Sequence, residues 1–263
     1  MHEPPVERFE GSILDPADLE RVVPGCDVVF HLAGQVSVPE SVEDPERTVL
    51  LNVVGTERVL EAVEKARVPA TVFASSCSVY GAASSTPFSE DSPLQTESPY
   101  AESNRQGEQT GYSGAEPFAA LRLFNVYGPG QADEGPYASV IGAFLSAALT
   151  KENPTIFGDG LQTRDFVYVD DVVEAMRATA EAVLQRGSVG PYNVGTGRAV
   201  TLLELWDAVA KAAGVDTRPV HRPARAGDVP HSCADVSKIQ SEVGWSSTMG
   251  LEEGIRRLVA SKS

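Results

Sequence analysis

The sequence has few basic residues and no long hydrophobic run. Lysine and arginine together number 21, against 37 aspartates and glutamates, which gives a net charge of −16. This balance argues against a nucleic-acid partner, because a phosphate backbone requires a basic surface. No apolar run approaches membrane-spanning length, and the N-terminal residues show no signal-peptide pattern. We therefore expect a cytoplasmic protein that contacts neither nucleic acid nor membrane.

Cysteine and histidine are also scarce. Three cysteines, Cys26, Cys77 and Cys233, lie far apart in the sequence and form no paired-thiol motif. We expect them to be small buried hydrophobic residues in a reducing compartment. The four histidines show no spacing typical of metal ligands, so the sequence predicts no metal site.

What is present is a pattern of short apolar strands that alternate with helices. A chain of 263 residues is long enough for one large α/β domain or for a domain with a small second lobe. One long helix is predicted to open at Asp44-Pro45, and close packing against a neighbour explains Gly55 inside it. The other predicted elements are strands near 28–32, 71–74, 118–124 and 192–194, a short helix after Asp15, and helices beginning near Ser98, Val140, Asp170, Thr201 and Leu251.

The stretch from Phe73 to Glu108 carries the most chemistry. The run Ser75-Ser76-Cys77-Ser78 ends the predicted strand, and Ser98-Pro99 starts a helix with serine at the N-cap and proline at the first helical position. Tyr100 and Asn104 follow four residues apart, on one face of that helix.

A strand followed by SSxSVYG, and then SPYxxS on a helix, resembles the active site of extended short-chain dehydrogenases, the sugar-nucleotide epimerase/dehydratase family. The resemblance implies a Rossmann-like doubly wound parallel sheet, NAD as cofactor, and a Ser/Tyr/Lys catalytic set. Ser76 matches the hydroxyl residue and Tyr100 the acid/base tyrosine. Asn104 stands where the family has its lysine.

The glycine-rich turn that holds the cofactor pyrophosphate in this family has no counterpart upstream of the matching segments. Three explanations remain open: a reading frame that starts late, a loss of NAD binding, or a second chain that supplies the unit. We expect residues 1–155 to form an incomplete dinucleotide-binding domain. The cofactor-binding residues that the resemblance implies are Asp15, Leu32, Ala33, Gly34, Asn52 and Ser75.

The sugar-nucleotide side of the family pattern is well matched. Asn125 ends a strand in RLFNVYGPG, although it could equally cap the turn. Arg164 belongs to GDGLQTRDFVYVDD, where the resemblance implies diphosphate binding and the alternative is a salt bridge to Asp165 or Asp170. Residues 156–263 are predicted to form mainly a sugar-nucleotide-binding lobe, with some segments returning to the sheet. The resemblance also implies that Ser78, Arg225 and Asp228 contact the substrate.

The residues at positions 77, 78 and 104 bear on which reaction the chain can catalyse. Without a nearby cation, only about one Tyr100 side chain in a thousand is tyrosinate at pH 7, a handicap of about 4 kcal/mol that a positive NAD ring would offset in part. Arg105 points about 100° around the helix from Asn104 and is a poor substitute. Family dehydratases place Asp-Glu directly after the catalytic hydroxyl residue, whereas this chain has Cys77-Ser78, so epimerisation is favoured over dehydration.

The leading hypothesis is an NAD-dependent epimerase that acts at C4 of a UDP-hexose through a transient 4-keto intermediate. The second is a non-catalytic relative that binds nucleotide sugars and has lost NAD binding. A plain NAD(P) oxidoreductase acting on a small carbonyl is disfavoured, because the diphosphate-binding pattern is retained. A homodimer formed through the two long helices is typical of the family, although their apolar faces could equally belong to the core.

Overall fold

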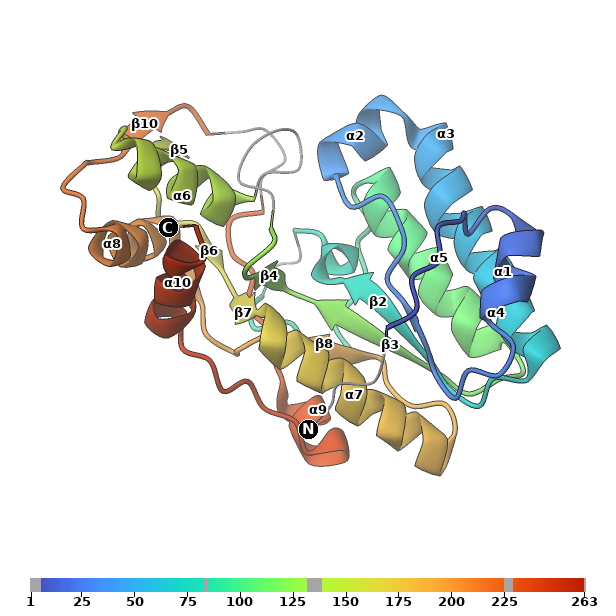
Figure 1. Cartoon of the computed structure of the whole chain (residues 1–263). Coiled ribbons are helices and arrows are strands. Elements are labelled where there is room, and N and C mark those ends of the chain that lie inside the picture. The colour runs from blue at the N-terminus through green and yellow to red at the C-terminus, as the bar shows by residue number, and fades with distance from the viewer. Residues whose placement is uncertain (1–5, 83–84, 132–138, 225–228, 263) are drawn as a thin grey trace.

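The computed structural model describes residues 6–82, 85–131, 139–224 and 229–262. At its centre lies a parallel sheet with helices on both faces, which Figure 1 shows. Its strands run in the order β1–β2–β3–β8. Their bounds are β1 (Val29–His31), β2 (Thr71–Ser76), β3 (Phe118–Leu123) and β8 (Tyr192–Val194). This arrangement confirms the predicted doubly wound α/β fold.

Side chains from alternate positions of the central strands enter two separate cores. Val72 and Leu121 belong to the core under helix α7 (Val169–Arg186). Phe73 and Phe118 form a second core with Tyr112 of helix α5 (Pro99–Ser113) on the opposite face. Both faces of β2 and β3 are therefore buried, which explains why the two strands read as nearly continuous apolar runs.

The remaining helices near the sheet follow the expected capping signals. Asp15 accepts a hydrogen bond from the N–H of Ala17, and Ser98 accepts one from the N–H of Ala101. These contacts fix the starts of α1 and α5. The other elements near the sheet are α1 (Pro16–Val22), α2 (Val38–Glu43), α3 (Pro45–Thr48), η1 (Val49–Val54), α4 (Gly55–Ala66) and η2 (Cys77–Tyr80). Helix α9 (Ser237–Val243) packs with α7 in the core on the other face.

The long helix predicted from Asp44 is present but not uniform. It begins with α3, passes through the π-helical segment η1 and continues as α4. The wider π turn accommodates Asn52, which is buried and pairs with the backbone of Gln35. The predicted close packing at Gly55 is confirmed, since a Cβ there would lie 2.6 Å from Cδ1 of Ile13.

A smaller lobe is built from three helices and short strand pairs, seen at the left of Figure 1. Its core joins Phe144, Trp206 and Ile255, and a capping box of Thr201 with Glu204 starts helix α8 (Leu202–Ala213) near the predicted position. The predicted boundary at residue 155 stays a prediction, because α6 shares this core while α7 and β8 lie at the sheet. The elements outside the sheet are β4 (Asn125–Tyr127), α6 (Val140–Thr150), β5 (Thr155–Phe157), β6 (Thr163–Arg164), β7 (Phe166–Tyr168), β9 (Val200–Thr201), α8 (Leu202–Ala213), β10 (Val220–Arg222) and α10 (Leu251–Ala260).

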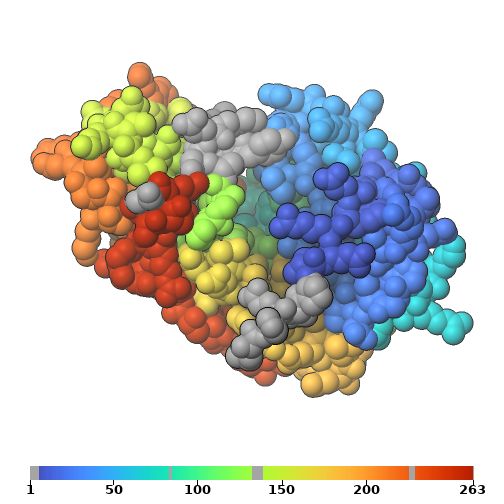
Figure 2. All heavy atoms as spheres, in the orientation of Figure 1, coloured from blue at the N-terminus to red at the C-terminus, as the bar shows by residue number. Residues whose placement is uncertain are grey.

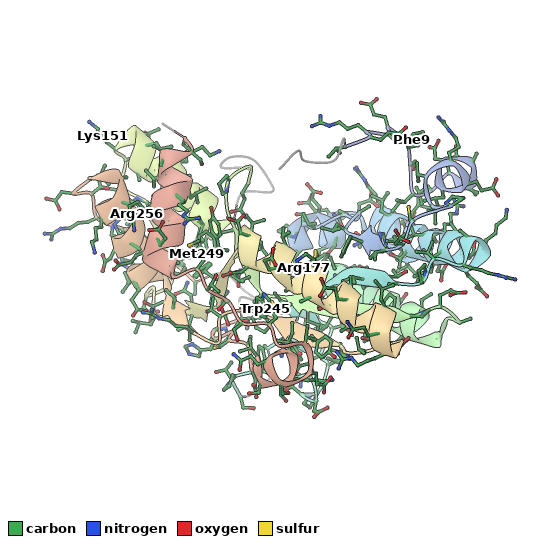
Figure 3. The ribbon with its side chains drawn as sticks, turned by 60° about the horizontal axis from the view of Figure 1, so that its bottom comes forward. Phe9, Lys151, Arg177, Trp245, Met249 and Arg256 are labelled. Carbon is green, nitrogen blue, oxygen red and sulfur yellow. The ribbon has the colours of Figure 1, made fainter. Side chains whose placement is uncertain are left out.

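Asp171 ties the segment between α9 and α10 to the start of α7. Its carboxylate accepts hydrogen bonds from the backbone N–H groups of Thr248 and Met249, and its carbonyl accepts one from Trp245 Nε1. Trp245 and Met249 are labelled in Figure 3. Asp171 therefore has a structural role, since it joins this loop to the start of α7.

The cysteines correct one expectation. All three are free, but only Cys233 is buried, whereas Cys77 is half-buried and Cys26 is exposed. Cys26 lies just after α1, where its thiol donates to the carbonyl of Val22 rather than packing into the core. No helix among the described residues is long and apolar enough to cross a membrane. In the same ranges, no group of three or more potential ligands could hold a metal ion.

The packing of α5 on β3 gives a stability prediction. A Cβ at Gly111 would lie 2.2 Å from the buried Phe118 ring, whereas a Cβ at Gly114 would meet its nearest atom at 3.4 Å. Gly111→Ala should lower the free energy of unfolding by about 1–3 kcal/mol, because overpacking outweighs the better helix propensity of alanine. Gly114→Ala is the matched control and should change it by less than about 0.5 kcal/mol. Urea unfolding of both variants measures this, and equal midpoints would contradict the packing argument.

Candidate active site

The structure brings the predicted serine and tyrosine together. Ser76 is the last residue of β2 and the N-cap of η2, where its Oγ accepts a hydrogen bond from the N–H of Ser78 at 3.1 Å. Tyr100 lies in the first turn of α5, and its phenol faces the Ser76 side chain, an interaction that lowers the pKa of the phenol. A strand end and a helix start therefore hold a hydroxyl and a phenol within proton-transfer reach.

The surroundings of Tyr100 keep its phenol protonated. Burial raises the pKa of this phenol above its usual value, and the hydrogen bonds with Ser76 and Asn104 offset only part of that rise. Asn104 is buried, and its Nδ2 also donates to the Tyr100 carbonyl at 2.9 Å. Asn104 thus contacts the phenol as the predicted position requires, but it brings no charge.

Arg105 does not supply the missing cation. Its guanidinium is paired with the carboxylate of Glu102 at 2.5 Å, on the half-exposed side of α5. This pair lowers the pKa of Glu102 to about 2, because the Arg105 hydrogen bond stabilises the carboxylate. The prediction that Arg105 is a poor substitute for the lysine agrees with this geometry.

A small cavity of about 40 Å³ opens beside the phenol. Four of the predicted cofactor-binding residues line it together with Tyr100 and Asn104. The four are Leu32, Ala33, Gly34 and Asn52. The loop after β1 and the tyrosine helix therefore meet at one site, as the resemblance implied.

Asn52 holds that loop in place. Its Oδ1 accepts from the N–H of Gln35 at 2.7 Å, and its Nδ2 donates to the Gln35 carbonyl at 2.9 Å and to Ser103 Oγ at 3.1 Å. Sequence reasoning did not identify Gln35 and gave no role to Ser103, which ends the SPYxxS motif. Ser103 follows Tyr100 by three residues on α5, and this spacing was a signal that could have found it.

Two predicted cofactor contacts lie elsewhere. Asp15 caps α1, where it accepts from Ala17, and it is not among the residues that line the cavity. Ser75 is buried, and its hydroxyl donates to Glu108 at 2.5 Å instead of facing the cavity. The structure therefore does not bring these two side chains to Tyr100.

The predicted substrate residues lie on the side of the smaller lobe. Asn125 and Arg164 both line an open groove of about 320 Å³, together with Gln162 and Phe157. The Arg164 guanidinium donates to the carbonyl of Thr163 at 2.8 Å. Arg225 and Asp228 lie outside the described residues. Figure 2 shows the blue N-terminal segment and the red C-terminal segment on two sides, with green atoms of the middle of the chain recessed between them.

The Ser78 hydroxyl, which is predicted to contact the substrate, is buried and forms no hydrogen bond with the described residues. Burial raises the pKa of the neighbouring Cys77 thiol to about 11, so this thiol stays protonated near neutral pH. Cys77 therefore cannot take the part of the acid/base carboxylate that family dehydratases have at its position.

Sequence reasoning did not identify the structural role of Asp165. Its fully buried carboxylate accepts hydrogen bonds from the backbone N–H groups of Thr196, Gly197 and Ala234. A Cβ at Gly195 would lie 2.7 Å from its Oδ2, so the glycine allows the turn to close around the carboxylate. These bonds fix the strand that presents Arg164, and the Gly-Thr-Gly run was the available signal.

The cavity beside Tyr100 has walls whose chemistry suits one end of a dinucleotide cofactor. A Cβ at Gly34 would lie 3.1 Å from Asn52 Oδ1, so the glycine lets the loop pack closely against Asn52. Leu32 and Val36 add exposed apolar surface next to it, at 57% and 61% exposure. A partly apolar, ring-shaped group such as nicotinamide matches these walls.

The fold and this site define a Rossmann-like protein in which Ser76 and Tyr100 lie side by side at the end of β2 and the start of α5. The chain belongs to the NAD dependent epimerase/dehydratase family, whose pattern matches residues 2–195. It is 41% identical over 239 residues to the UDP-glucose 4-epimerase of Mycolicibacterium smegmatis, which covers 89% of this chain and 75% of that protein.

Two solved structures are similar in fold. The UDP-glucose 4-epimerase of Thermotoga maritima with UDP-glucose is 34% identical, with a TM-score of 0.90 over 97% of this chain and 83% of that one. The UDP-glucose 4-epimerase of Bifidobacterium longum in complex with NAD+ and UDP is 28% identical, with a TM-score of 0.89 over 98% and 83%. The predicted family, fold and NAD dependence are thereby confirmed, and the comparisons favour the epimerase over the non-catalytic alternative.

Proposed function

We propose that this protein is an NAD-dependent epimerase that inverts C4 of a UDP-hexose through a transient 4-keto sugar. The observation that carries the proposal is the position of Tyr100, whose side chain faces Ser76 and lines the cavity formed with residues 32–36. Removal of hydrogen from a secondary alcohol needs a proton acceptor at the hydroxyl and a hydride acceptor at the carbon. Tyr100 meets the first need.

The chain's own residues then have distinct tasks. Ser76 orients and polarises the sugar oxygen, and Tyr100 takes the hydroxyl proton and later returns it. Leu32, Ala33, Gly34 and the loop held by Asn52 would hold the nicotinamide end of the cofactor. NAD, when bound, supplies a reversible hydride acceptor.

The groove at Asn125 and Arg164 is proposed to bind the nucleotide diphosphate. A guanidinium can form two parallel hydrogen bonds to phosphate oxygens, and Asp165 fixes the strand that presents it. Asn125 is fixed in turn, because its N–H donates to the Asp165 carbonyl at 2.9 Å. This supports a nucleotide-sugar substrate over a small carbonyl compound.

Product analysis tests the reaction. The purified chain, incubated with UDP-glucose and NAD, should form UDP-galactose, which chromatography separates. A 4-keto-6-deoxy sugar would instead show a dehydratase. Calorimetric titration with NAD in the presence of UDP tests the cofactor site independently of turnover, and an absence of NAD binding together with an absence of product would overturn the proposal.

Diphosphate binding gives a separate prediction. Arg164→Ala should weaken UDP binding at least tenfold, because a charge-assisted pair contributes about 1.5–3 kcal/mol. Arg177→Ala is the control: this arginine lies on the outer side of α7, paired with Glu174 and Glu181, and is labelled in Figure 3. Its dissociation constant for UDP should stay within about twofold. Isothermal titration measures both, and equal affinities would place the diphosphate elsewhere.

Quaternary structure and compartment stay predictions. A homodimer through α4 and α5 would cover apolar surface that η1 leaves open, where Val49 and Leu50 are nearly half exposed. Size-exclusion chromatography with light scattering would detect it. Three free cysteines are compatible with the cytoplasm, where thiols stay reduced.

A further inference from the structure

A buried ion pair lies behind the Ser/Tyr site without lining either cavity. Glu108 of α5 and Arg122 of β3 are 2.8 Å apart, and their side chains are about 5% exposed. A second bond, from Arg122 Nε to Glu108 Oε1 at 3.0 Å, makes the pair bidentate. Such a geometry fixes the two elements relative to each other.

The pair contacts the catalytic segment on both sides of Ser76. Glu108 Oε1 accepts from Ser75 Oγ at 2.5 Å, directly before the serine. Arg122 Nη1 donates to the Tyr80 hydroxyl at 3.0 Å, at the end of η2. Tyr80 in turn donates to Asn193 Oδ1 at 2.6 Å. The short segment that carries Ser76 is therefore held at both ends by one buried network.

Glu108 also lies on the helix that carries Tyr100. Eight residues separate the two, a rise of about 12 Å along a continuous helix. Two consecutive residues of β2 thus contact α5, with Ser75 bound to Glu108 and Ser76 to Tyr100. Because helix and strand are both rigid, the first contact constrains the second.

We propose that Glu108 is a positioning residue of the proposed epimerase, which sets the Ser76–Tyr100 geometry through its bond to Ser75. This inference rests on the proposed function. It assigns the Ser75 hydroxyl to the support of the site and not to cofactor contact. Proton transfer falls off steeply when donor and acceptor move apart, so a small shift of Ser76 lowers turnover without changing diphosphate binding.

The test removes the hydrogen bond between Ser75 and Glu108 and leaves the ion pair between Glu108 and Arg122 intact. Removing Glu108 would strand a buried guanidinium and could unfold the chain, so Ser75→Ala is the informative variant. It should lower kcat at least tenfold, with the KM for UDP-glucose and the dissociation constant of NAD within about twofold. Ser75→Thr, which keeps the hydroxyl, should restore most of the activity.

The matched control is another buried hydroxyl. Thr179 is fully buried in α7, and its Oγ1 has no hydrogen-bond partner among the described residues. Thr179→Val should leave kcat unchanged. A loss of NAD binding in Ser75→Ala would show a cofactor role for Ser75, and a kcat within twofold of the unsubstituted chain would show that the link does not matter. Either result overturns the proposal.

A second readout needs no turnover. In protein labelled with ¹³Cζ-tyrosine, the Tyr100 signal is the one that disappears in Tyr100→Phe. This signal should shift in Ser75→Ala and stay in place in Thr179→Val, because it reports the hydrogen bond to Ser76. An unchanged signal overturns the positioning role, whereas a shifted signal in a chain without any epimerase activity would leave that role standing and contradict the proposed function.

Discussion

Tyr100→Phe is expected to lower kcat for C4 epimerisation by about 10³-fold. The substitution removes only the phenolic oxygen, which is the group hydrogen-bonded to Ser76 beside the cavity. General acid–base catalysis by a positioned side chain contributes about 10²–10⁴-fold, and no other group among the residues lining the cavity can exchange a proton near neutral pH. Initial rates with UDP-glucose and NAD measure the effect.

A second tyrosine on the same helix serves as the control. Tyr112 is 12 positions further along α5, and its hydroxyl donates to the Val189 carbonyl at 2.9 Å. Tyr112→Phe should cost about 1 kcal/mol of stability and leave kcat within twofold. The dissociation constant for UDP should be unchanged in both variants. If Tyr100→Phe retained more than a tenth of the activity, another group would be the proton acceptor.

Sequence patterns were sufficient where the structure is local. The strand end at Ser76 and the helix start at Ser98-Pro99 are each specified within a few residues, and together they predicted where the serine and the tyrosine lie. The capping box at Thr201 and the buried face of α8 follow from equally local spacing. The family resemblance then placed Asn125 and Arg164 on one groove.

The contacts that support the site are long-range, and no local pattern specified them. Ser75 and Glu108 are 33 positions apart, and Asp165 and Ala234 are 69 apart. The family resemblance implied that Ser75 contacts the cofactor, but its side chain contacts α5 instead. The group to which the Ser75 hydroxyl donates depends on how α5 packs on the sheet. This packing is a property of the tertiary structure and not of the local sequence.

The π-helical segment η1 is another feature that the sequence pattern did not predict. Apolar spacing from Val49 to Val63 predicted one regular helix, and it could not show that Asn52 would pair with Gln35. Sequence reasoning did identify the absent cation at position 104. The structure adds that the Tyr100 phenol is buried. Because burial raises the pKa of this phenol, the lack of a nearby cation leaves less tyrosinate at pH 7 than in the unfolded chain.

Asn104→Lys is expected to raise kcat at pH 7 by about 10–100-fold. Burial raises the pKa of the Tyr100 phenol, and an ammonium group in hydrogen-bond contact would lower it by about 1–2 units. Below the pKa, each unit of lowering gives about ten times more tyrosinate. Rates measured from pH 6 to 10 follow the change, with Asn104→Met as a control of similar length without the charge.

The pH profile distinguishes this cause from a general improvement in packing. Tyrosinate is the reactive form, so the rate of the unsubstituted chain should rise about tenfold per pH unit between pH 7 and 9, below the raised pKa. In Asn104→Lys the rising limb should bend at a lower pH, while Asn104→Met keeps the original profile. Equal gains in both variants at every pH would show that charge is not the cause. No activity in either variant, with UDP still bound, would mean that the Ser76–Tyr100 pair does not act as a catalytic unit, and the nucleotide-sugar groove would then be the part of the family's machinery that this chain uses.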